Sequence, residues 1–141
     1  MRVVVTGYGR CGRALATRLK LLGAEVFVVA RSAKDLSYAS VDGCVPIPLP
    51  EYREYPVNAD AVFNTIPIRI FDSALLSLLP SDTVIFELAT GNAGVDMEWA
   101  EQLHIKVVPL PSLPGKTSPK SAGEIICAVV RDKLHSHFEG R

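Results

Sequence analysis

A glycine-rich turn near the start of the chain has the clearest chemical meaning. It is the run Gly7-Tyr8-Gly9-Arg10-Cys11-Gly12, which follows a β-branched segment and precedes a stretch of helical periodicity. In a strand–turn–helix context the first glycine permits a tight turn, the second admits a diphosphate to the backbone, and the third lets the helix pack on the strand. Free N–H groups at the helix start attract phosphate, and Arg10 would add a charged contact. The run therefore predicts the pyrophosphate site of a dinucleotide, with a glycine turn that binds nothing as the alternative.

The residues after the second expected strand indicate which dinucleotide binds. NAD-binding domains usually have Asp or Glu there, because a carboxylate accepts hydrogen bonds from the ribose hydroxyls. Here Ala30 takes that place, Arg31 and Ser32 follow, and no carboxylate occurs before Asp35. A guanidinium and a hydroxyl bind a 2′-phosphate, and Lys34 could assist them. The pattern favours NADP while leaving NAD possible, and a solvated arginine at a helix start is the alternative interpretation.

Two further expected strands end at the same edge of the sheet, where ligands of open α/β domains bind. The candidate residues at these ends are Asn64, Thr65, Ile66, Pro67, Leu88 and Ala89. Asn64 and Thr65 could hydrogen-bond the ribose or the nicotinamide. They could equally cap the next turn, and the pattern alone leaves both possibilities open.

The segment 113–123, LPGKTSPKSAG, precedes a last expected helix, with Ser118 as N-cap and Pro119 in its first turn. It is rich in cations and hydroxyls. Lys116, Lys120 and Ser121 would suit a carboxylate-bearing substrate or the cofactor carboxamide. A proline-stiffened connection with exposed lysines is the alternative.

Short apolar strands alternate with helical stretches, which predicts βαβ units on a parallel sheet. The expected strands are 3–6, 26–30, 44–49, 61–65, 83–88 and 105–109; the expected helices are 10–22, one from the Ser32 cap to 41, 71–79, 97–103 and one after 118. Pro46, Pro48 and Pro50 suit an edge strand, because proline donates no ladder hydrogen bond. The third strand is an edge in the order 3-2-1-4-5-6. The predicted fold is therefore α/β, a doubly wound parallel sheet of the Rossmann type.

The composition sets limits on function. The 141 residues suit one domain, expected over 1–138 with a frayed tail at 139–141, and the formal net charge of zero gives no indication of nucleic acid or an anionic membrane. Cys11, Cys44 and Cys127 are too scattered for a disulfide framework or a zinc site, so no metal is expected. No apolar stretch approaches the ~20 residues of a membrane span, and no signal peptide is evident. We expect a cytoplasmic protein.

The motifs together resemble the NAD(P)-binding domain found in the A subunits of dipicolinate synthases. The resemblance covers nearly the whole chain and depends on GYGRCG at 7–12, ARS at 30–32, NTIP at 64–67 and LPGKTSPKSAG at 113–123. It implies an oxidoreductase of bacterial sporulation that converts dihydrodipicolinate to dipicolinate with NAD(P). It also places Leu113 to Lys120 around nicotinamide and substrate.

The resemblance further implies an N-terminal catalytic domain, or a partner subunit, that this chain lacks. On its own the chain is then expected to be inactive, because a cofactor domain cannot enclose a substrate and exclude water. Two other functions fit the same residues. One is a regulatory domain that senses nucleotides, and the other is the cofactor domain of another small-acid dehydrogenase.

Overall fold

Strands and helices alternate along the part of the chain that the structure, a computed structural model, describes, namely residues 1–110, 131 and 135. The strands are β1 (Arg2–Thr6), β2 (Glu25–Ala30), β3 (Val45–Pro48), β4 (Ala61–Asn64), β5 (Val84–Glu87) and β6 (Lys106–Pro109). The helices are α1 (Arg10–Leu21), α2 (Ala33–Val41), α3 (Leu49–Glu54), α4 (Ser73–Leu76) and α5 (Met97–Gln102), with a short 3₁₀ helix at Thr90–Asn92.

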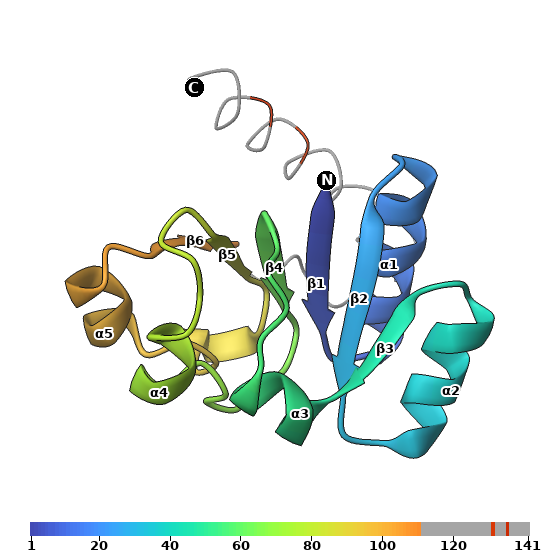
Figure 1. Cartoon of the computed structure of the whole chain (residues 1–141), viewed down its shortest axis with the longest axis horizontal. Helices are drawn as coiled ribbons and strands as arrows, with labels where there is room; N and C mark the ends of the chain where they lie inside the picture. Colours follow the sequence, from blue (N-terminus) through green and yellow to red (C-terminus); the bar gives the residue numbers. More distant parts are fainter. Residues whose placement is uncertain (111–130, 132–134, 136–141) are drawn as a thin grey trace.

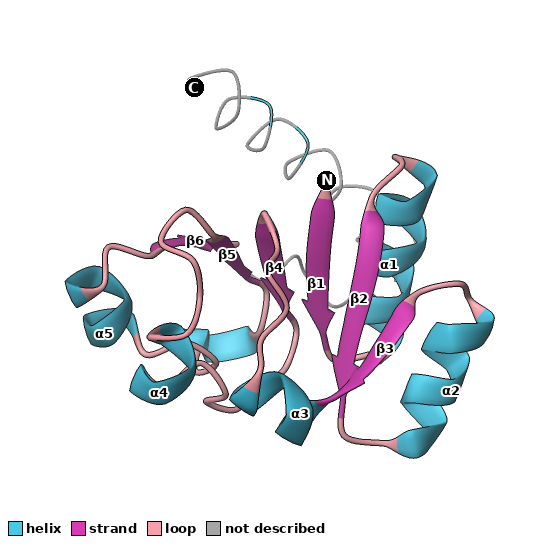
Figure 2. Ribbon diagram, in the orientation of Figure 1, coloured by secondary structure: helices cyan, strands magenta, loops and turns pink. Residues whose placement is uncertain are grey.

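The strands of the described residues pair in parallel in one six-stranded sheet with the order β3-β2-β1-β4-β5-β6 (Figure 1). Helices cover both of its faces (Figure 2). The predicted α/β doubly wound Rossmann fold, with its strand order, is confirmed. Among the described residues, no helix has both the length and the apolar character needed to cross a bilayer.

Two apolar cores lie on opposite faces of the sheet, because successive strand side chains alternate in direction. Val3 and Val5 of β1 pack in the core that Leu15 and Leu19 of α1 complete. Val4 belongs to the other core, which contains residues of α3, α4 and α5. The central strands are therefore apolar on both sides, as their uninterrupted apolar sequences predict.

The register of the central strands brings three polar residues into one row. Thr6 pairs with Asn64, and Asn64 pairs with Glu87, at the last positions of β1, β4 and β5. All three side chains are buried, with no more than 1% exposed. Since parallel strands end at the same edge, this row lies beneath the edge at which a Rossmann ligand is expected.

The helix predicted over 71–79 is shorter in the structure. Phe71 forms an isolated parallel bridge with Val95, and the Asp72 carboxylate accepts a hydrogen bond from Leu75 N, so α4 begins at Ser73. Beyond Leu76, the N–H groups of residues 78 and 79 bond to carbonyls three residues back. The apolar periodicity was right for a helical turn, but a strand-like contact and a 3₁₀-type ending shorten it.

The third strand is an edge strand, as its prolines predict, but it ends earlier than expected. β3 stops at Pro48, and α3, which the sequence analysis did not predict, follows at once. Pro50 lies in the first turn of α3, where proline costs no helix hydrogen bond. Leu49 and Tyr52 are spaced for one helical face and are buried in the core.

At the C-terminal end, Arg131 and His135 have helical backbone. The rest of the predicted last helix, the segment 113–123 and the tail lie outside the described residues. The domain limits of 1–138 and 139–141 stay predictions.

Candidate functional site

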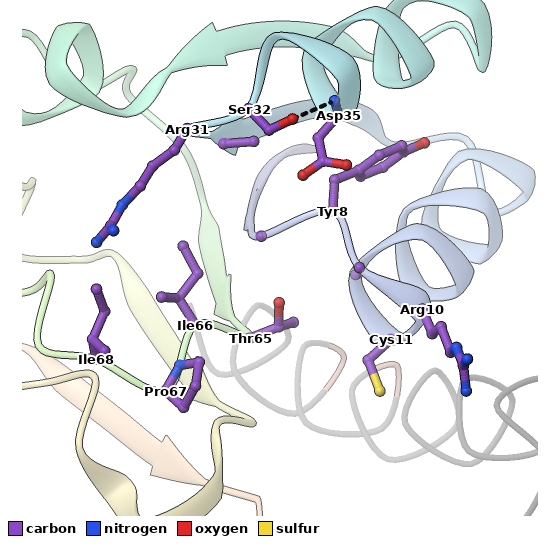
Figure 3. A pocket seen from close by; sticks show the side chains of 14 residues that line it. Tyr8, Arg10, Cys11, Arg31, Ser32, Asp35, Thr65, Ile66, Pro67 and Ile68 are labelled. Carbon is purple, nitrogen blue, oxygen red and sulfur yellow. Dashed lines mark hydrogen bonds between the residues drawn. The ribbon is translucent and has the colours of Figure 1, made fainter.

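A pocket of about 630 Å³ opens at the carboxyl edge of the sheet, at the ends of β1, β2 and β4 (Figure 3). The strand order reverses direction between β1 and β4, and this switch point is where ligands of doubly wound sheets bind. The volume is within the usual range for ligand pockets. The lining residues are Gly7, Tyr8, Gly9, Arg10, Cys11, Gly12, Ala30, Arg31, Ser32, Asp35, Thr65, Ile66, Pro67 and Ile68.

The glycine turn has the geometry that the sequence predicts. Gly7 has a φ of 88°, a conformation that favours glycine, and its N–H donates a 2.8 Å hydrogen bond to the Val29 carbonyl. A Cβ on Gly7 would collide with Thr65 Oγ1, and one on Gly12 would collide with the Gly7 carbonyl. These two glycines therefore let the turn, β4 and α1 approach closely.

Gly9 plays a different part, because its surroundings are open. It is the N-cap of α1, no side chain caps the helix, and the first turn contains no acidic residue. A Cβ on Gly9 would have no heavy atom within 4 Å. The first-turn N–H groups of α1, which have no partner inside the helix, are thus left with an open space that suits an anion such as a diphosphate.

Two residues within the turn differ in orientation. Cys11 is exposed and lies with Arg10 at the start of α1, across the pocket from Arg31 and Ile68 (Figure 3). Tyr8 is only 5% exposed and belongs to the core beneath α1. Its hydroxyl donates a 2.7 Å hydrogen bond to Asp42 Oδ2, so the ring anchors the turn to the end of α2.

The electrostatics of this anchor follow from burial and hydrogen bonding. Burial, and then the bond to Asp42, raise the pKa of Tyr8, so the phenol stays protonated. The hydrogen bond from Tyr8, followed by that from Arg13, lowers the pKa of Asp42. Arg13 also forms an ion pair with Asp42, with Nε 2.8 Å from Oδ2.

The end of β2 brings together the residues expected to select the nucleotide. Ala30 is buried, whereas Arg31 and Ser32 are exposed and line the pocket. Ser32 caps α2, since its Oγ accepts a 3.3 Å hydrogen bond from Asp35 N. Because the Ser32 hydroxyl acts only as an acceptor in this cap, it can still donate a hydrogen bond to a ligand.

The structure separates the two charged residues that follow. Asp35, which the sequence indicated only as the first carboxylate after Ala30, lines this pocket and also a neighbouring hollow on the α1–α2 side. Lys34, a predicted ligand, does not line the pocket; its Nζ lies 5.9 Å from the Tyr38 ring centroid, beside the neighbouring hollow. Of these two residues, only Asp35 lines the pocket, whereas both line the neighbouring hollow.

At the end of β4 one residue is buried, and the next three residues line the pocket. Asn64 is fully buried: Oδ1 accepts hydrogen bonds from Thr6 Oγ1 at 2.6 Å and Ile66 N at 3.2 Å, and Nδ2 donates to Glu87 and to the Ile66 carbonyl. This arrangement favours the turn-capping alternative for Asn64. Thr65, Ile66 and Pro67 do line the pocket, with Thr65 Oγ1 donating to the Thr6 carbonyl at 2.8 Å.

Glu87 is a residue that the sequence analysis missed. Only 1% of it is exposed, and its Oε1 accepts 2.9 Å hydrogen bonds from both Ala89 N and Asn64 Nδ2. Burial raises the pKa of this carboxyl group, and the two hydrogen bonds offset part of the effect. Its signal in the sequence was an acidic residue inside an otherwise apolar strand.

The remaining predicted residues are not part of the described pocket lining. Leu88 packs against the α1-side core, and Ala89 is buried with its N–H bonded to Glu87. Leu113, Lys116, Lys120 and Ser121 lie outside the described residues. Within the described part of the chain, no group of three or more His, Cys, Asp or Glu is arranged to hold a metal ion.

Comparison with known proteins identifies a relative. No protein-family model matches the chain. Over 133 residues the chain is 38% identical to the A subunit of dipicolinate synthase from Bacillus subtilis (strain 168), and the match covers 94% of this chain and 45% of the relative. The predicted resemblance is confirmed.

Solved structures of two kinds of enzyme are also similar to the chain. The A subunit of dipicolinate synthase from Bacillus halodurans is 34% identical with a TM-score of 0.77, over 94% of this chain and 46% of that one. Shikimate 5-dehydrogenase from Thermus thermophilus, in complex with NADP(H) and shikimate, is 26% identical with a TM-score of 0.57, over 75% of this chain and 41% of that one. The chain therefore spans less than half the length of each of these relatives.

Proposed function

We propose that this chain is an NAD(P)-binding domain of an oxidoreductase and that NADP is its preferred ligand. The observation that carries the proposal is the uncapped start of α1, which faces an open space at Gly9 inside the pocket. There the first-turn N–H groups bind the pyrophosphate. Arg31 and Ser32, on the β2 side of the same pocket, bind the 2′-phosphate of the adenosine ribose.

The other pocket wall orients the dinucleotide. Thr65, Ile66 and Pro67 lie opposite Ser32 (Figure 3), where they pack against the ligand. Asn64 holds both the N–H and the carbonyl of Ile66, so it positions this wall without touching the ligand. When bound, the nicotinamide accepts a hydride from the substrate.

The similarity to the A subunits of dipicolinate synthases supports a specific reaction, the oxidation of dihydrodipicolinate to dipicolinate. In that reaction the substrate loses a hydride to the nicotinamide and a proton to a base. Lys116, Lys120 and Ser121 are proposed to bind the substrate carboxylates. The links to sporulation and to the cytoplasm stay predictions.

A further part of the enzyme is proposed to complete the substrate site. The chain covers 45% of its Bacillus subtilis relative. Enclosing a substrate and excluding water requires surfaces on both sides of the nicotinamide. We therefore expect little turnover from this chain alone, with the remaining contacts supplied by an N-terminal catalytic domain or a partner subunit.

Substitution of Gly9 tests the dinucleotide site. Gly9→Asp places a carboxylate against the pyrophosphate, while aspartate remains a favourable N-cap and its Cβ meets no other atom. We expect NADP affinity, measured by isothermal titration calorimetry, to fall about a hundredfold or more, with the melting temperature of the unliganded chain unchanged or raised. Gly9→Asn, equal in size but uncharged, separates the volume effect from the charge effect. Unchanged NADP binding by Gly9→Asp, or no binding by the wild type, would refute the proposal.

A second titration tests the substrate end. The chain saturated with NADP is titrated with dipicolinate, and Lys120→Ala is compared with the wild type. We expect weaker dipicolinate binding with unchanged NADP affinity. If the wild type binds dipicolinate and Lys120→Ala binds it equally well, the proposed role of Lys120 in binding the carboxylates is wrong.

A further inference from the structure

The backbone of Asp35 is hydrogen-bonded to Ser32, just beyond the end of β2. Asp35 is the third residue of α2, and its N–H donates to Ser32 Oγ, the capping atom of that helix. Side chains on a helix lean toward the helix N-terminus. The half-buried Asp35 side chain therefore lies between the pocket and the neighbouring hollow, whereas Lys34 lines only the hollow.

Arg31 and Asp35 approach the pocket from different directions. Figure 3 shows the Asp35 carboxylate directed from α2 toward the glycine turn, while the Arg31 side chain extends away from it, toward Ile68. No ion pair between Arg31 and Asp35 occurs among the bonds of the described residues. A ligand at the end of β2 therefore meets a cation on one side and an anion on the other.

The two nucleotides would experience these charges differently. A 2′-phosphate is attracted by Arg31 and repelled by Asp35, whereas the ribose hydroxyls of NAD are neutral and donate hydrogen bonds to a carboxylate without charge repulsion. Asp35 also places a negative charge in the first turn of α2, which reduces the attraction of that helix end for a phosphate. The first turn of α2 thus contains a carboxylate, although the end of β2 at Ala30 has none.

We infer that Asp35 is a specificity-determining residue that opposes the 2′-phosphate, so that the preference for NADP over NAD is narrow and both nucleotides bind. This inference rests on the proposed dinucleotide site. On this inference Arg31 and Ser32 raise the affinity for NADP, and Asp35 limits that increase.

The test compares Asp35→Asn with the wild type by calorimetric titration with NADP and with NAD. Asparagine keeps the shape and removes the charge. We expect the ratio of NADP to NAD affinity to rise about tenfold, mainly through tighter NADP binding. Glu98→Gln, which removes one negative charge from an exposed site on α5, is the matched control and should leave the ratio unchanged.

Ionic strength gives a second measurement. In Asp35→Asn the Arg31 attraction is no longer offset, so NADP affinity should fall more steeply with added salt than in the wild type. Equal salt slopes, an unchanged affinity ratio, or equal changes in both affinities would overturn the inference while leaving the dinucleotide site in place. If the wild type binds neither nucleotide, the proposed function itself fails.

Discussion

The hydroxyl of Tyr8 donates a 2.7 Å hydrogen bond to Asp42, the residue that ends α2. Tyr8 stands between two glycines of the proposed pyrophosphate turn, and its ring is packed in the core. The glycines make the turn possible, but the bond to Asp42 fixes it against a helix end that lies 34 residues further along the chain. The shape of the proposed pyrophosphate turn therefore depends on the packing of α2 as well as on the local sequence.

Removal of the Tyr8 hydroxyl should weaken this anchor. Tyr8→Phe keeps the ring and loses one hydrogen bond to a partly exposed carboxylate, which should lower the free energy of unfolding by about 1 kcal/mol. NADP affinity should fall only a few-fold, because the backbone N–H groups remain. Urea denaturation and titration calorimetry measure the two effects. Tyr38→Phe, at an exposed ring, is the control.

The difference in stability between the wild type and Tyr8→Phe should also depend on pH. The Tyr8 bond and the Arg13 contacts lower the pKa of Asp42, so they add stability above the ordinary Asp pKa, and this stability is lost as the pH falls through the lowered value. The difference between wild type and Tyr8→Phe should shrink in acid. A difference that grew as the pH fell would contradict this account.

Because the pKa of Glu87 is raised, the free energy of unfolding should fall as the pH rises. Burial raises the pKa of Glu87 above the ordinary 4.5, so the folded chain holds this proton at pH values where the unfolded chain has released it. Stability then decreases as the pH rises from about 4.5 through the raised pKa, by about 1.4 kcal/mol for each pKa unit between the two states. Denaturation curves between about pH 4 and pH 8 should show this decline in the wild type and lose it in Glu87→Gln.

The outcome for Glu87→Gln has its own control. Glu101→Gln removes an exposed carboxylate on α5 and should leave the pH profile of stability as it is in the wild type. Glutamine can still accept a hydrogen bond from Ala89 N, so the variant should fold. Identical pH profiles for wild type and Glu87→Gln would show that the buried carboxyl group does not titrate differently in the folded state.

Arg31→Asp should reverse the nucleotide preference. NADPH should raise the melting temperature of the wild type more than NADH does at equal concentration, and the variant should show the opposite order, because a second carboxylate then faces the 2′-phosphate. Lys34→Asp makes the same charge change outside the pocket lining and should alter the order far less. If Arg31→Asp kept the wild-type order, the guanidinium would have no role in selecting NADP.

The glycines of the turn should respond unequally to a methyl group. Gly12→Ala forces a Cβ onto the Gly7 carbonyl, so we expect a loss of about 3 kcal/mol or failure to fold. A Cβ on Gly9 meets no other atom, so Gly9→Ala should lower the free energy of unfolding only by the loss of a better N-cap residue, about 1 kcal/mol or less. Circular dichroism melting curves compare them directly, and equal destabilisation by both changes would contradict the geometry of the turn.

Several features follow from the sequence alone because their causes are local. The β-branched runs and the spacing of the glycines predict parallel strands and the turn after β1, and the prolines of 46–50 predict an edge strand. The positions of Arg31 and Ser32 at the pocket follow in the same way, since they come directly after a strand whose end must lie at the ligand edge. Each of these predictions depends on neighbours within a few residues.

Only the tertiary structure decided which other polar side chains face the pocket and which are directed away from it. Asn64 turns inward to form hydrogen bonds with Thr6 and Glu87, and these partners lie 58 and 23 residues away in the sequence. Asp35 lines the pocket and Lys34 does not, because the packing of α2 against β2 and β3 sets the direction in which each side chain of α2 points. A periodic pattern predicts which face of an element is buried, but which polar group faces a ligand depends on contacts between elements that are distant along the chain.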